Sequence, residues 1–165
     1  MKTLFITRHA KTHPAVEGGS DSDRSLTERG QSDARLMASE LSKRNWVPDI
    51  VISSPARRAI ETSRLMCDGL RIRDFEVAGF LYGYYSLSQL TTHLHSTCQH
   101  AGSVMIIAHN PLLAKMADDF TGYFYQHLST TGVVLVDFDI DGWNEATRHG
   151  GALRDYLYPK LFKST

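Results

Sequence analysis

Three short polar segments, each directly after an apolar run, constrain this chain more than any other feature. The apolar runs cover residues 3–6, 50–53 and 104–107, and they have the length and composition of buried β-strands. Segments with helical periodicity lie between them, so the sequence predicts an α/β fold with three layers, α/β/α, around a mostly parallel central sheet. The polar segments are Thr7-Arg8-His9-Ala10, Ser54-Pro55-Ala56-Arg57-Arg58-Ala59 and Ala108-His109-Asn110-Pro111.

The helical segments carry recognisable start signals. Thr27 can cap a helix whose apolar residues recur at helical spacing, namely Ala34, Met37, Ala38 and Leu41. Ser86 can cap another helix, and Pro111 suits the first turn of a third. The polar stretch 12–25 has no periodicity, so we expect a loop there at the rim of the sheet.

The last part of the chain indicates an antiparallel edge on the sheet. Residues 133–139 and 143–147 flank Asp141-Gly142, a dipeptide typical of two-residue hairpin turns. A length of 165 residues suits one well-filled domain, and we predict a single domain over residues 1–165.

Charge and composition argue against some classes of binding partner. Lysine plus arginine equals aspartate plus glutamate at 18 each, so we expect neither nucleic acid nor a membrane surface as a partner. No apolar stretch approaches the roughly 20 residues of a membrane helix. Cys67 and Cys98 form no CxxC pair, and we expect both to be reduced in a cytoplasmic protein.

The three polar segments place histidine and arginine at strand ends. Ligands bind just beyond the carboxyl ends of strands in open α/β sheets, so we expect Arg8, His9, one arginine of the Arg57–Arg58 pair and His109 to surround one cavity. Arginine forks suit phosphate oxygens, and a neutral imidazole can act as a nucleophile. The sequence therefore predicts phosphoryl chemistry.

His9 is the predicted nucleophile. Positive charge from the neighbouring arginines lowers the pKa of a histidine, which leaves the ring neutral with a free lone pair at pH 7. His109 is expected to clamp the phosphoryl oxygens, and Asn110 with nearby backbone N–H groups would add donors. The alternatives are that the arginines of the second segment are solvated charges and that His109 merely caps the next helix.

A second group of residues is expected at the rim of this cavity. These residues are Lys11, Asp21 and Arg24, which lie close in sequence to the end of the first strand. They have two interpretations: they contact the substrate, or they are charged side chains of a solvated loop. The aromatic run at Tyr82, Tyr84 and Tyr85 has two interpretations, core packing or a pocket wall.

In the three polar segments that contain Arg8-His9, Arg58 and His109, the chain resembles the histidine phosphatase superfamily, and within it the SixA-type phosphohistidine phosphatases. The resemblance implies a phosphoglycerate mutase-like fold, a transient phosphoryl group on His9, and a phosphate pocket of Arg8, Arg58 and His109 without metal or cofactor. Arg58 is chosen over Arg57 because the family arginine directly precedes alanine. The segments that carry the resemblance are Arg8-His9, residues 21–30, Trp46-Val47-Pro48-Asp49, Arg58-Ala59-Ile60-Glu61-Thr62 and Ala108-His109-Asn110-Pro111.

One departure from the larger family members has a chemical consequence. Those members carry a glutamate general acid in an inserted segment, whereas residues 80–88 here contain no Asp or Glu. Imidazole, with a pKa of about 6.5, can leave protonated by solvent, whereas an alkoxide needs an acid. We therefore predict a phosphohistidine protein phosphatase whose partner is a histidine-phosphorylated signalling or phosphotransfer protein.

Two alternatives stay open at this point. One is a phosphatase for small phosphate esters, with Asp21, Asp23, Glu17 or a tyrosine as its acid. The other is a phosphate-binding module without catalytic activity that recognises a partner.

Overall fold

The computed structural model describes residues 1–123, 125 and 127–164, and it is built on a six-stranded sheet in the order β3-β2-β4-β1-β5-β6. Four neighbouring strands are parallel, and β5 pairs antiparallel with both β1 and β6. The prediction of a mostly parallel sheet with an antiparallel edge is confirmed. The strands are β1 (Lys2–Arg8), β2 (Ile50–Ser53), β3 (Asp74–Val77), β4 (Ser103–Ala108), β5 (Val133–Phe138) and β6 (Ala152–Leu157).

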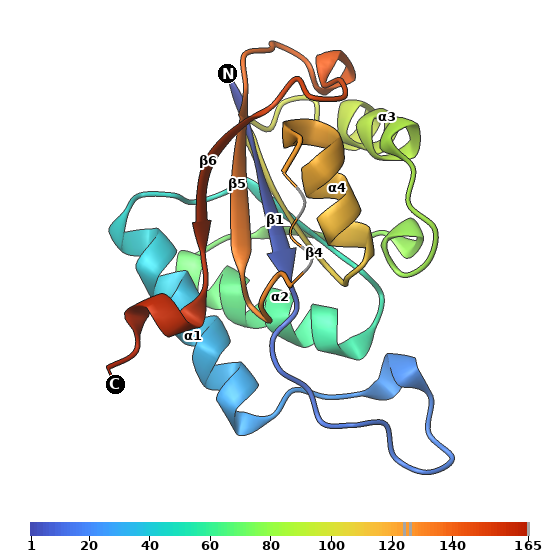
Figure 1. Ribbon diagram of the computed structural model, residues 1–165, viewed down its shortest axis with the longest axis vertical. Coiled ribbons are helices and arrows are strands. Elements are labelled where there is room, and N and C mark those ends of the chain that lie inside the picture. Colours follow the sequence, from blue (N-terminus) through green and yellow to red (C-terminus); the bar gives the residue numbers. More distant parts are fainter. Residues whose placement is uncertain (124, 126, 165) are drawn as a thin grey trace.

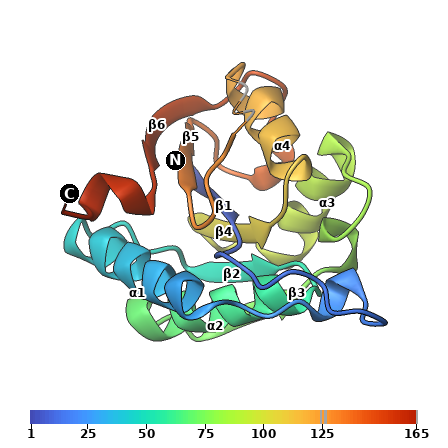
Figure 2. The same ribbon diagram turned by 60° about the horizontal axis from the view of Figure 1, so that its bottom comes forward.

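Helices cover both faces of the sheet, as Figures 1 and 2 show. The helices α1 (Glu28–Lys43) and α2 (Arg57–Leu70) pack on one face, and α3 (Leu87–Thr97) and α4 (Leu112–Thr121) lie on the other. The predicted caps are present, since Thr27 Oγ1 accepts from the backbone N–H of Gly30 at 2.9 Å and Ser86 Oγ from that of Gln89 at 3.1 Å. These caps satisfy N–H groups that have no partner within the first helical turn.

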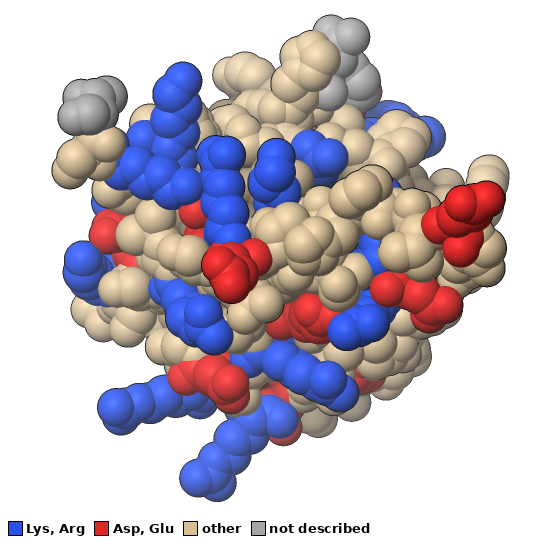
Figure 3. All heavy atoms as spheres, turned by 90° about the horizontal axis from the view of Figure 1, so that it is seen from below, with Lys and Arg blue, Asp and Glu red and all other residues tan. Residues whose placement is uncertain are grey.

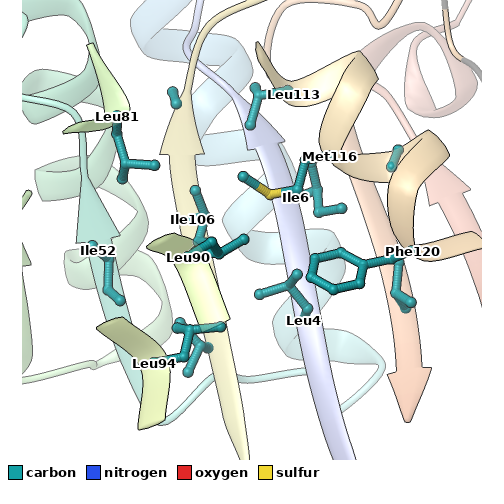
Figure 4. Packing of buried hydrophobic residues seen from close by; sticks show 14 of the residues in the cluster. Leu4, Ile6, Ile52, Leu81, Leu90, Leu94, Ile106, Leu113, Met116 and Phe120 are labelled. Atoms are coloured by element: carbon teal, nitrogen blue, oxygen red, sulfur yellow. The ribbon is translucent and has the colours of Figure 1, made fainter. Parts of the chain in front are cut away.

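The core consists of two layers, one on each side of the sheet. Leu4 and Ile6 of β1 point toward α3 and α4, where Phe120 packs against them (Figure 4). Phe5, between them in sequence, belongs to the opposite cluster with Met37 of α1. Successive side chains of a strand alternate between faces, so a strand with helices on both sides needs an uninterrupted apolar run. This requirement explains why the runs before the polar segments are apolar throughout.

The predicted hairpin around Asp141-Gly142 is wrong. Residues Trp143–Glu145 form a 3₁₀ turn, and β5 pairs instead with β6 at Ala152–Leu157. The cause is Trp143, whose side chain is fully buried against the ring of Phe138 and whose Nε1 donates to the Ala101 carbonyl at 3.1 Å. Because this indole is buried, residues 143–145 pack against α3 and do not join the sheet.

The parallel register places three strand ends at one edge of the sheet. Arg8 pairs with Ala108, and Ser53 pairs with Ile107, so β1, β2 and β4 end level with one another. The segment 12–25 crosses the same end of the molecule and contains the 3₁₀ turn Asp21–Asp23 (Figure 1). Among the described residues, no helix has the length and apolar character needed to cross a membrane.

Candidate active site

The two histidines and one arginine of the polar segments meet at this edge. His9 follows β1, His109 follows β4, and Arg58 lies in the first turn of α2. Their exposed fractions are 7%, 9% and 6%. The two imidazole centroids lie 5.3 Å apart, and Arg58 Nε donates to His109 Nδ1 at 3.2 Å. Side chains far apart in sequence therefore share one small buried space.

The hydrogen bonds around His9 determine which ring nitrogen is free. His9 Nδ1 lies 2.7 Å from the carbonyl oxygen of Ala10. A carbonyl oxygen only accepts, so Nδ1 carries the proton and the neutral ring has its lone pair on Nε2. The Ala10 N–H donates to Thr62 Oγ1 at 2.9 Å, and that hydroxyl donates to the Arg58 carbonyl at 2.7 Å. Thr62 therefore links the His9 segment to α2.

Both imidazoles are neutral near pH 7. Burial lowers the pKa of His9 to about 3, and the positive charges of Arg58 and Arg8 add to the shift, while the bond to Ala10 opposes it. Burial also lowers the pKa of His109 to about 4, with Arg58 as the next cause. The sequence pointed to the arginines alone, but desolvation of the ring is the larger effect.

His109 is held by two protein partners. Its Nδ1 accepts from Arg58, so the proton of the neutral ring is on Nε2, which lies 2.7 Å from Ser54 Oγ. In this geometry a phosphoryl oxygen would contact a nitrogen of His109 only by replacing one of these partners. No role was assigned to Ser54 from the sequence. Its position directly after β2, beside the end of β4, could have indicated that it contacts His109.

Arg8 and Asn110 converge on the backbone of another loop. Arg8 Nη1 donates to the Leu128 carbonyl at 2.7 Å, and Asn110 Nδ2 donates to the same oxygen at 3.4 Å. Within the described residues, buried Arg8 Nε and Asn110 Oδ1 have no hydrogen-bond partner. A buried donor without a partner costs about 1–3 kcal/mol, so the Arg8 N–H has a preference for an oxyanion.

Asp21 reaches the site from the rim. Arg58 Nη1 donates to the Asp21 carbonyl at 2.8 Å, and Arg58 Nη2 donates to Asp21 Oδ2 at 3.0 Å. The Tyr82 hydroxyl donates to the same carboxylate oxygen at 2.9 Å, and its ring packs edge-on against His109 with centroids 5.6 Å apart. Tyr82 therefore contacts both Asp21 and His109 at the site, whereas Tyr85 is buried in the core and Tyr84 is exposed.

The other two residues expected at the rim, Arg24 and Lys11, form no hydrogen bond with Arg58 in the described part of the chain. Arg24 braces the loop itself, since its Nη2 donates to Thr12 Oγ1 at 2.6 Å and its Nε to the His13 carbonyl at 3.0 Å. The Lys11 side chain is exposed, and its backbone carbonyl accepts from the N–H of Thr27 at 3.0 Å. The structure thus gives Arg24 a place in loop organisation and leaves Lys11 on the surface.

The surface around the site carries many positively charged side chains. Figure 3, which views the molecule from below Figure 1, shows Lys and Arg side chains across this face with fewer Asp and Glu. The chain has no net charge, so the local excess is a property of the fold, and such a face attracts anions. Among the described residues, no group of three His, Cys, Asp or Glu side chains is arranged to hold a metal ion.

Fold and site together define an α/β protein with two neutral histidines and two arginines at the carboxyl ends of a parallel sheet. The family model for the histidine phosphatase superfamily (branch 1) matches residues 4–78. Over this range the chain is similar to the superfamily.

Similar proteins extend over nearly the whole chain. It is 29% identical to the phosphohistidine phosphatase SixA of Escherichia coli over 142 residues, which are 84% of this chain and 87% of that protein. The structure of a protein histidine phosphatase SixA complexed with tungstate superposes with a TM-score of 0.84 at 26% identity, covering 98% of this chain and 99% of the other. A structure described as the putative phosphohistidine phosphatase SixA from Agrobacterium tumefaciens gives 0.80 at 26% identity, with 96% and 98% covered.

Proposed function

We propose that this protein is a phosphohistidine phosphatase that hydrolyses P–N bonds through a phosphoryl group carried by His9. The observation that carries the proposal is the bond from His9 Nδ1 to the Ala10 carbonyl, because it leaves Nε2 as the free lone pair of a neutral ring. The similarity to SixA proteins over most of the chain supports the same activity.

The reaction has two displacement steps. His9 Nε2 attacks phosphorus while the P–N bond of the substrate breaks, and the electron pair of that bond passes to the leaving imidazole nitrogen, which takes a proton from solvent. Water then attacks the phosphorus of phospho-His9, and the P–Nε2 bond breaks to give phosphate and the free imidazole. Arg8 and Arg58 stabilise the charge on the phosphoryl oxygens in both steps.

The ionisation of Asp21, the carboxylate bonded to Arg58, supports a P–N rather than a P–O substrate. Hydrogen bonds from Tyr82 and Arg58 lower the pKa of Asp21 to about 2, so this carboxyl is ionised at neutral pH and has no proton to give. The Tyr82 hydroxyl donates its own proton to Asp21, and that bond raises the pKa of Tyr82. An alkoxide leaving group would need a proton donor, whereas an imidazole can take its proton from water.

The partner we propose is a histidine-phosphorylated signalling or phosphotransfer protein in the cytoplasm. The name of the E. coli relative supports this class of substrate. Cys67 and Cys98 are both free thiols, which accords with a reducing compartment.

The test compares two substrates and one covalent intermediate. Phosphate release is measured with a phosphohistidine-bearing protein and with an alkyl phosphate, and phospho-His9 is trapped by an alkaline denaturing quench and mass spectrometry. We expect faster release from the P–N substrate, no release by His9→Ala, and normal release by His13→Ala, because His13 is exposed on the rim loop.

Each alternative predicts a different result in the same experiment. Faster hydrolysis of the alkyl phosphate would identify an ester phosphatase and contradict the proposal. Absence of any phosphorylated His9, together with unchanged partner binding by His9→Ala, would identify a binding module.

A further inference from the structure

The carboxylate of Asp21 shares the guanidinium that is proposed to bind the phosphoryl group. The Arg58 side chain is 8% exposed, whereas that of Asp21 is 54% exposed, so Asp21 stands on the solvent side of the arginine. A guanidinium has five N–H groups. Three of those on Arg58 point at His109 Nδ1, the Asp21 carbonyl and Asp21 Oδ2. The other two, one on each Nη, lie outside these three contacts.

Three residues hold Asp21 in this position. Besides Arg58, the Tyr82 hydroxyl donates to Oδ2 at 2.9 Å, and Arg24 Nη1 approaches Oδ1 at 3.4 Å. Tyr82 is itself fixed by its edge-on contact with the ring of His109. The negative charge is therefore held beside Arg58, and hydrogen bonding from Tyr82 and Arg58 keeps the pKa of Asp21 at about 2, far below neutral pH.

We propose that Asp21 is a specificity-determining residue that disfavours substrates carrying a second negative charge beside the phosphoryl group. A small acidic phosphate ester would bring its carboxylate toward that of Asp21 once its phosphoryl group contacts Arg58. The imidazole of a phosphohistidine side chain brings no negative charge there, so it meets no such repulsion. The inference rests on the proposed function for the site of phosphoryl binding, and it adds the class of substrate that the site rejects.

The expected size of the effect follows from Coulomb's law. Two unit charges roughly 7 Å apart change a dissociation constant about threefold at a dielectric constant of about 80 and about 50-fold at about 20, and a half-exposed carboxylate lies between these limits, at about tenfold. Removing the charge of Asp21 should therefore recover about this factor for a carboxylate-bearing ligand.

A matched pair of ligands isolates the charge. 3-Phosphoglycerate and glycerol 3-phosphate have the same three-carbon length, and they differ by a carboxylate in place of a hydroxymethyl group. Their dissociation constants are measured by chemical-shift titration with the wild-type protein, with Asp21→Asn, and with Asp23→Asn. Asp23 lies in the same 3₁₀ turn and bonds to Ser20 Oγ, so its replacement makes the same charge change away from Arg58.

We expect the wild-type protein to prefer glycerol 3-phosphate, Asp21→Asn to reduce that preference about tenfold, and Asp23→Asn to leave it nearly unchanged. A purely structural role in holding Arg58 would weaken both ligands by the same factor, and an unchanged ratio in Asp21→Asn overturns the proposal. Failure of glycerol 3-phosphate to bind the wild-type protein overturns it too. The ratio of the two dissociation constants is measured without turnover. The role of Asp21 is therefore tested separately from the proposal that the protein hydrolyses phosphohistidine.

Discussion

Replacing His9 with asparagine should make the free energy of unfolding less dependent on pH. Burial holds the pKa of His9 at about 3 in the folded protein, whereas the unfolded chain has an ordinary imidazole pKa of about 6.5. Between these two values the unfolded state binds one more proton at this residue than the folded state does. A histidine with a lowered folded pKa therefore destabilises the fold progressively as the pH falls below about 6.5.

The magnitude follows from the two pKa values. Each pH unit in this window changes the free energy of unfolding by about 1.4 kcal/mol per histidine, so the change between pH 7 and pH 5 is about 2 kcal/mol for His9. His109, whose pKa is lowered to about 4, adds a similar loss. His9→Asn should remove the first contribution and keep the second, while any cavity left by the smaller side chain shifts stability at all pH values alike.

The assay is urea unfolding at pH 7, 6 and 5 in buffers without phosphate or sulfate, followed by tryptophan fluorescence. Trp143 is fully buried and Trp46 packs partly buried against the other core layer, so the fluorescence of both reports on the core. His13→Asn, at an exposed position of the rim loop, is the control and should have the wild-type slope. If His9→Asn loses as much stability between pH 7 and pH 5 as the wild-type protein, His9 is not held neutral by the fold and the reasoning is refuted.

Two further predictions concern the contacts around the histidines. Arg8→Ala should weaken the binding of inorganic phosphate by about 10- to 100-fold, the loss expected for charged hydrogen bonds. Arg57→Ala should leave it unchanged, because Arg57 pairs with Glu61 on the surface. Equal losses for the two variants in calorimetry would refute this prediction. Thr62→Val should cost about 1–3 kcal/mol in urea unfolding and reduce phosphate release, because it leaves the buried Ala10 N–H without its partner, and Thr62→Ser should restore both. A fully stable valine variant would show that this hydroxyl does not support the loop.

The errors of sequence reasoning have identifiable causes. Asp141-Gly142 is a strong local turn signal, but burial of the Trp143 indole determines the path of the chain there, and burial of so large a side chain outweighs a turn preference. The low pKa of His9 was attributed to neighbouring arginines, which are visible in sequence as charges. Its main cause is desolvation, which depends on what covers the ring and has no signature in a single segment.

Sequence patterns alone predicted β1, β2, β4 and β5, the helix caps, and the place of Arg8, His9 and His109 at one edge of the sheet, whereas the family resemblance selected Arg58 over Arg57. Apolar runs and caps are local signals, and parallel strands necessarily end on the same side of a sheet. The folded structure was needed to show which nitrogen of His9 is free, that Ser54 and Arg58 hold His109, and that Asp21 bonds to Arg58. These properties depend on hydrogen bonds whose geometry exists only after the whole chain has packed, because a difference of about 1 Å makes or breaks such a bond.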